Sequence, residues 1–465
     1  MGVSRTTNST PEPDDSGRRK AAPAGKATNT TTFMESIAAA WSVPELRNRI
    51  TFVFAMFGVY VVGLHIPLPT VDHSALEQFF NKGNGGSILN LVDVFSGGAL
   101  KKFTVFAMGI VPYINSSIIM QLLTFAIPQW QELAREGEQG RKRIAQYTRY
   151  LTVVLAVVQA CGLGGLLWSQ HILTHSPAYF AHMVVTLVAG TCFLMWLGEM
   201  ITDKGIGNGV SLIIFAGIMV RLPSQIVAVA ASVQSGAVSP WQGLVLALAF
   251  FGTVWGIVFV TLGQRRIPIQ HVRRIVGNKM TQGGMSYLPF RIASAGVIPI
   301  IFAISIVLLP MTFAQYLPDR GPAHWMHWLA NAFTPGRFTL GGVVSSLIYA
   351  LIIIGFTYFY TAITMDIQHI AEDLKKYGSF IPGVRPGRPT EEYLDRVMTR
   401  ITLAGALFLA LVALLNYWVP AATNTANTFT LVGGTSLLIV VGVALDTMQA
   451  IEAQLLMRHY EGFIR

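Results

Sequence analysis

The sequence has little charge and almost no cysteine. Asp, Glu, Lys and Arg make up 12% of the residues, about half the share of an ordinary soluble domain. The two cysteines, Cys161 and Cys192, both fall inside apolar runs, which indicates neither a disulfide framework nor a metal site. The sequence has no nucleophile with a base at plausible spacing, no phosphate loop and no HExxH motif. These absences argue against an enzyme or a metalloprotein.

Carboxylates are also scarce in the middle of the apolar runs. Glu199, Asp366, Asp446 and Glu452 lie near the ends of these runs. An ion-coupled carrier usually has carboxylates near the membrane midplane, although each costs roughly 2.5–3.5 kcal/mol to insert. The absence of such carboxylates argues against an ion-coupled carrier.

Long apolar runs dominate what is present. The chain is 52% hydrophobic, and a run near 20 residues crosses a hydrocarbon core of about 30 Å. We therefore predict an all-α polytopic membrane protein with ten transmembrane helices. The runs cover 50–67, 103–127, 147–168, 181–201, 210–226, 241–262, 293–316, 341–364, 401–419 and 431–449.

The positive charges predict the orientation. If the N-terminus is inside, the inner segments hold 27 of the 33 Lys and Arg residues. The sequence before the first run has no apolar core of the kind found in a cleavable signal peptide. The six on the outer side are Lys82, Lys101, Lys102, Arg221, Arg320 and Arg337. Because cytoplasmic loops carry an excess of Lys and Arg, we expect a multi-pass protein with both termini in the cytoplasm.

The runs divide the chain into two halves of five spans. We expect a disordered tail at 1–32, an amphipathic interfacial helix at 33–49, an N-terminal half at 50–234, a C-terminal half at 235–452 and a C-terminal tail at 453–465. If the two halves are similar, the odd number of spans in each gives them opposite orientations in the membrane. Inverted repeats of this kind have their functional site at the interface between the halves.

One stretch points to a plug in front of a pore. Residues 91–102 contain the pair Gly97-Gly98 and are too short to span the membrane. The next run carries several groups that lipid-facing helices avoid: Gly109, Pro112, Asn115, Ser116, Ser117 and Gln121. We expect this run to face protein or water, and 91–102 to re-enter the membrane.

Two inner loops, 263–292 and 366–400, are longer than a connection needs. In the first, basic residues alternate with apolar ones as in a basic hairpin; the second contains a turn stiffened by Gly and Pro. The candidates for partner docking are Arg265, Arg266, Arg273, Arg274, Lys375, Lys376, Arg385 and Arg388. Attraction to anionic lipid, worth about 1 kcal/mol per charge, explains such a cluster, and so does binding to ribosomal RNA or an acidic protein face.

A glycine motif lies between two spans. Residues 198–217 read GEMITDKGIGNGVSLIIFAG and contain Gly205-x-Gly207-x-Gly209. No strand precedes the motif, so it is a poor match to a dinucleotide site. We predict a tight inner turn.

Seven ordered motifs together resemble the SecY family, the central subunits of the bacterial Sec protein-conducting channel. They are the 91–124 stretch, GEMITDKGIGNGVSLIIFAG, QRRIP, AGVIPIIFAISIVLLP, FIPGVRPG, VMTRITLAGALFLA and GGTSLLIVVGVALD. The similarity runs from about residue 33 to residue 460. It implies two inverted five-helix halves around an hourglass pore, with a short re-entrant plug helix.

The resemblance also implies particular site residues. The aliphatic ring at the pore waist falls on Ile110, Ile114, Val210, Ile214, Ile301 and Ile439, where Val210 replaces the usual isoleucine. The plug falls on Phe95, Ser96, Gly97 and Gly98. The lateral gate lies between the spans that contain 109–121 and 297–309.

The implied function is a channel in the plasma membrane that passes unfolded secretory chains and releases membrane segments sideways into lipid. It performs no bond chemistry and needs no cofactor. The ribosome or the SecA motor ATPase supplies the energy by docking on the basic loops, with Arg385 as the foremost contact, and SecE and SecG are partner subunits. Signal sequences and nascent chains pass through it. Two alternatives remain: an accessory SecY paralogue with few substrates, and an inverted-repeat solute carrier.

Overall fold

The computed structural model describes most of the chain. The described residues are 41–81, 93, 96–173, 176–236, 238–271, 275–276, 279–280, 284–293, 296, 298–303, 340–422 and 434–461. The predicted tail at 1–32, most of the predicted helix at 33–49 and most of the span at 293–316 lie outside them. Phe95, Arg273 and Arg274 do as well.

Nine helices form the body of the molecule among the described residues. They are α2 (Pro44–Gly63), α5 (Val111–Ala126), α7 (Glu138–Ser169), α8 (Pro177–Lys204), α9 (Gly209–Gln234), α10 (Pro240–Leu262), α13 (Leu340–Thr364), α15 (Arg388–Ala422) and α16 (Gly434–Glu461). Eight helices in the described ranges are long and apolar enough to cross a membrane, and α5 with α6 (Pro128–Arg135), bent by 104°, makes a ninth. In the run at 293–316, the described residues 298–303 are helical.

Several helices extend past the predicted runs. Helix α7 begins at Glu138 and α15 at Arg388, well before the predicted starts at 147 and 401. Polar turns continue each helix beyond its apolar part, as the exposed i,i+4 pair between Glu138 and Lys142 illustrates. Helix α2 begins at Pro44, so residues 44–49 belong to the first long helix and not to a separate interfacial helix.

The prediction of a helix from residue 103 was wrong at its start. Helix α5 begins at Val111, and its 16 residues give a length of about 24 Å. The backbone is left-handed at Phe103 and Gly109, and Pro112 occupies the first turn of α5, a position that proline tolerates because the N–H there has no helical partner. The segment before α5 is instead hydrogen-bonded to the residues that follow α2, since the Leu68 N–H donates to the Phe103 carbonyl.

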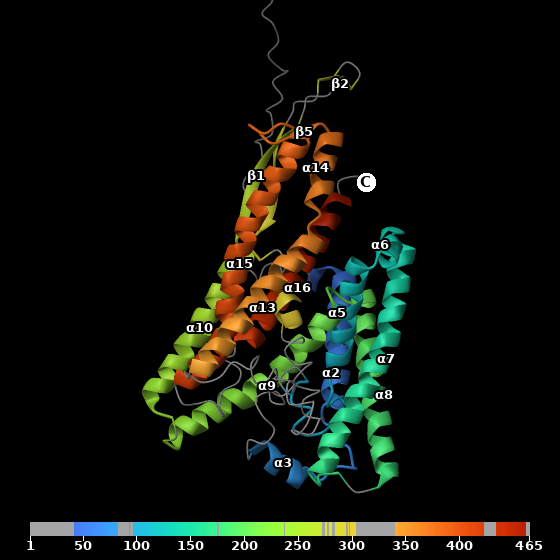
Figure 1. Ribbon diagram of the computed structural model, residues 1–465, viewed down its shortest axis with the longest axis vertical. Coiled ribbons are helices and arrows are strands. Elements are labelled where there is room, and N and C mark those ends of the chain that lie inside the picture. Colours follow the sequence, from blue (N-terminus) through green and yellow to red (C-terminus); the bar gives the residue numbers. More distant parts are fainter. Residues whose placement is uncertain are drawn as a thin grey trace, which may run out of the picture.

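The helices form two groups that meet along α9 (Figure 1). Helices α2, α5, α7 and α8 lie on one side and α10, α13, α15 and α16 on the other, while α9 runs obliquely between them. Helix α9 packs against α8 and α2 in the first group and against α16 and α10 in the second. The short helix α3 (His73–Asn81) lies at the opposite end of the molecule from the strands.

Large apolar side chains cover the outward faces of these helices. On α10, Trp241, Phe251, Trp255 and Phe259 are all exposed. A soluble monomer rarely exposes contiguous apolar surface on this scale, whereas lipid-facing helices do so throughout. The pattern agrees with a multi-pass membrane protein.

The strands gather at one end. Strand β1 (Gln264–His271) pairs antiparallel with β4 (Met285–Arg291) and, through its last residues, with β5 (Ser379–Phe380). Two short strands, β2 (Ile275–Val276) and β3 (Lys279–Met280), pair beyond β1. The expected basic hairpin in the first long loop is thus confirmed.

The glycine motif makes the predicted tight turn between α8 and α9. Gly207 has a positive φ of 78°, which favours glycine because it has no Cβ. A Cβ on Gly209 would overlap the carbonyl oxygen of Gly198, so the start of α9 touches the backbone of α8.

Gly209→Ala is expected to destabilise the protein by about 1–3 kcal/mol, because overpacking forces backbone shifts. The measurement is the midpoint of thermal unfolding in detergent. Gly165→Ala on α7 is the matched control, since a Cβ there meets nothing within 4 Å and alanine favours a helix by about 1 kcal/mol. Equal midpoints for the two variants would contradict the close approach of α8 and α9.

Candidate functional site

The six residues assigned to the waist lie in one apolar cluster. Ile110, Ile214 and Ile439 belong to its buried core, and Ile114, Val210 and Ile301 pack against that core. The cluster draws side chains from both helix groups. None of the six is among the exposed large hydrophobic residues of the described part of the chain.

Local structure explains where the ring residues sit. Val210 and Ile214 fall in the first turns of α9, whose start is capped by Asn208: its side-chain oxygen accepts N–H groups of Val210 and Ser211 at 3.0 and 3.3 Å. Ile110 is the residue just before α5, and its carbonyl accepts the Ile114 N–H at 3.1 Å. Both pairs therefore lie at the starts of helices, and all four side chains belong to or pack against the same apolar cluster.

The sequence predicts a plug at 91–102, of which the structure describes Asp93 and residues 96–102. We call these residues, together with Phe103, the plug turns. Residues 96–103 form successive hydrogen-bonded turns. Ser96 is fully buried. A Cβ on Gly97 would come within 3.0 Å of the Gly217 Cα and 3.1 Å of the Tyr60 hydroxyl. The plug turns thus press closely on α9 and α2.

An ion pair ties the plug turns to α9. Arg221 Nη1 lies 2.8 Å from Asp93 Oδ2, and the two side chains are 15% and 0% exposed. Beside them, burial lowers the pKa of the Lys101 ammonium, while the nearby Asp93 carboxylate opposes that shift.

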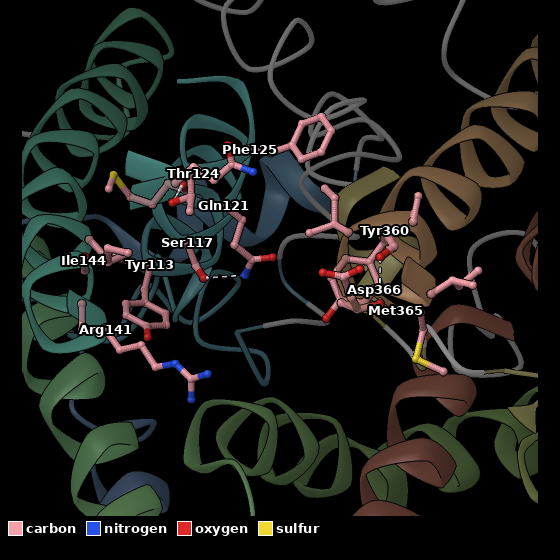
Figure 2. Close-up of a pocket in the computed structure, with 18 of the residues that line it drawn as sticks. Tyr113, Ser117, Gln121, Thr124, Phe125, Arg141, Ile144, Tyr360, Met365 and Asp366 are labelled. Carbon is pink, nitrogen blue, oxygen red and sulfur yellow. Dashed lines mark hydrogen bonds between the residues drawn. The ribbon is translucent and has the colours of Figure 1, made fainter. Parts of the chain in front are cut away.

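A cavity of about 740 Å³ opens between the two helix groups and is lined by α5, α6 and α7 on one side and by α13 and the start of α14 (Ile367–Lys376) on the other. Figure 2 shows Tyr113, Ser117 and Gln121 of α5 on one side and Tyr360 and Asp366 on the other. Part of its lining is polar, as the hydrogen bond from Gln121 Nε2 to Ser117 Oγ shows. Of the polar residues in the second predicted span, Ser117 and Gln121 line this cavity, whereas Asn115 and Ser116 are buried within the protein. Both arrangements agree with the prediction that this span faces protein or water.

The two long loops fold into one unit, which consists of β1, β4, α14, β5, the turn after β5 and the first turns of α15. We call this unit the docking platform, because it carries the residues that the sequence predicts to bind partners. Its small core contains Ile267, Phe290, Ile381 and Leu394. His271 joins three strands: its Nδ1 bonds Ser379 Oγ at 2.7 Å and its Nε2 bonds Ser286 Oγ at 2.8 Å.

The described basic candidates all point to solvent from this platform. Arg265 and Arg266 lie on β1, Lys375 and Lys376 end α14, and Arg385 and Arg388 flank the Gly/Pro turn; all six are exposed. Within the described ranges, Arg385 has no ion-pair partner, whereas Arg388 lies 4.0 Å from Glu392.

Two features escaped the sequence reasoning. The Asp93–Arg221 pair joins distant parts of the chain, and the only signal was Arg221 itself, a charge within an otherwise apolar helix. The His271 bridge gave no signal, because its serine partners lie on two other strands.

Comparison with known proteins identifies the family. The SecY family model matches residues 104–448. Protein translocase subunit SecY of Streptomyces galbus is 41% identical over 452 residues, which cover 93% of this chain and 100% of that protein. The Thermotoga maritima protein of the same name is 42% identical over 435 residues, 92% of this chain and 96% of its own.

Solved structures show the same fold. A structure described as a protein conducting channel has a TM-score of 0.64 at 16% identity, covering 90% of this chain and 96% of its own. A second, whose title says that the plug domain of SecY stabilises the closed channel and maintains a membrane seal, has a TM-score of 0.61 at 17% identity and the same coverage. Sec61 in the canine ribosome–channel complex has a TM-score of 0.61 at 15% identity, covering 90% of this chain and 96% of its own.

These likenesses confirm the predicted channel fold of the ten-span type, which is mostly helical and carries its strands at one end. The chain belongs to the SecY family of protein translocase subunits.

Proposed function

We propose that unfolded polypeptide crosses this channel through a waist made by Ile110, Ile114, Val210, Ile214, Ile301 and Ile439. The chain is a subunit of the protein translocase and a channel, not an enzyme. The observation that supports the waist is the gathering of all six side chains into one apolar cluster shared by both helix groups.

An aliphatic waist suits this task physically. A narrow apolar constriction holds no stable water column, so it resists ions at rest. The same side chains require no particular hydrogen bond, so they close around a polypeptide of any sequence. Apolar segments leave sideways into lipid past α5, beside the cavity that separates the two groups.

Energy comes from outside the chain. The docking platform presents its exposed cations to the ribosome or to the SecA motor, and the ribosome-bound Sec61 structure supports the first partner by its likeness to this chain. The excess of Lys and Arg on this side supports a cytoplasmic location for the platform and for both termini, in a protein of the plasma membrane. SecE and SecG complete the assembly.

Ile439→Asn is expected to make the resting channel leak ions several-fold faster and to relax its demand for a good signal sequence. An amide buried without a partner costs about 1–3 kcal/mol, so water follows it into the waist. The measurements are dye-detected ion flux in vesicles that hold the assembled translocase, and export of a substrate with a weakened signal.

Ile439→Leu is the matched control, because this swap keeps the volume and apolar character of the side chain. Its flux should equal that of the parent. If the asparagine variant also behaves like the parent in both assays, Ile439 is not part of the waist.

Arg385→Glu is expected to impair motor-driven translocation strongly while the protein remains folded and inserted. The arginine is exposed and lacks an ion-pair partner among the described residues. Reversing the charge of this side chain therefore affects docking and not packing. Arg385→Gln should give a weaker defect, because it removes the charge without reversing it. The measurement is post-translational import of a preprotein into membrane vesicles; normal import by Arg385→Glu would exclude this role.

A further inference from the structure

A buried ion pair in the plug region has no assigned role. Among the ion pairs of the described residues, Asp93–Arg221 differs from the exposed ones because its carboxylate is 0% and its guanidinium 15% exposed. Exposed pairs contribute little, since water and salt screen them. Removing one partner of a buried pair is costly, because the other charge is left without compensation.

Asp93 organises the plug turns from within. Its carbonyl accepts the Gly98 N–H at 2.9 Å and the Ser96 hydroxyl at 3.1 Å. Its Oδ1 accepts the Lys101 N–H at 2.9 Å. Only Oδ2 is then left to face α9, where it meets Arg221. One oxygen of the carboxylate therefore stabilises the plug turns, and the other binds Arg221 on α9.

Arg221 stands on the same stripe of α9 as the proposed waist. Val210, Ile214, Gly217 and Arg221 follow one another at i, i+4, i+7 and i+11, the spacing of a single helix face. Along this face, Val210 and Ile214 belong to the proposed waist, Gly217 leaves room for the close approach of Gly97, and Arg221 provides the positive charge. The stem of Arg221 also lies 3.5 Å from the Cβ position of Gly98.

We propose that Asp93 and Arg221 form a latch that holds the plug against α9 and sets how readily the channel opens. The proposal rests on the proposed waist and plug. Displacing the plug separates the two charges, and the closed state persists because each charge is compensated only there. The pair acts on the position of the plug and does not contact the polypeptide in the resting channel.

The test measures how accessible the plug is. Ser96→Cys, a replacement of similar size, is placed in a chain whose Cys161 and Cys192 are changed to Ala. A membrane-impermeant maleimide is added to the outside of spheroplasts that produce this full chain with its partner subunits. Ser96 is buried, so labelling in the parent is slow.

Arg221→Met keeps the length of the stem and removes the charge, and Asp93→Asn keeps the acceptor for the Lys101 N–H. Each should speed labelling by on the order of tenfold or more, as expected when a buried pair loses one member. The double variant should label no faster than the faster single one, because the two changes remove the same interaction. Lys102→Met is the matched control: it removes an exposed positive charge from the plug turns and should leave labelling unchanged.

If Arg221→Met and Asp93→Asn label no faster than Lys102→Met, the latch is overturned. If Arg221→Met fails to insert, Asp93→Asn alone decides. Faster labelling beside an Ile439→Asn variant that does not leak would keep the latch and count against the proposed waist. Unchanged labelling beside a leaking Ile439→Asn would keep the waist and exclude the latch.

Discussion

Hydrocarbon offers no partner to a backbone N–H or C=O group, and this constraint governs the arrangement of the whole molecule. Residues 96–110 are largely irregular backbone just before a membrane helix, so they are stable there only when protein encloses them. The turns before α5 meet this need through hydrogen bonds among themselves and to the exit of α2, such as Val105 N–H to the Ile66 carbonyl. The two helix groups then close around the segment.

The same enclosure brings the functional elements together. Because α9 lies between the groups, one of its faces serves the central cluster and the plug turns at once. The waist, the close glycine contact and the buried charge are consecutive parts of one helix. A change in how α9 packs is therefore felt at all three.

Hydropathy predicted the long helices well, because the bilayer imposes their length and composition. Its failure at α5 has a clear cause: residues 103–110 are largely apolar, yet the backbone is left-handed at Gly109 and the helix starts only at Val111, with Pro112 in its first turn. An average of hydropathy registers neither residue. Periodicity within α9 predicted that Val210 and Ile214 share a face. The partners of Arg221 and His271 were beyond prediction, because contacts between distant segments leave no spacing in a single sequence.

The three-stranded sheet has a mechanical consequence. Strand β1 starts two residues after α10 ends, and β5 sits between α14 and α15. Since β1 is bonded to β5 and His271 clamps the strands, a load applied to either loop reaches α10 and α15 together. Because α10 and α15 both pack against α16, and α15 also packs against α13, these four helices share such a load.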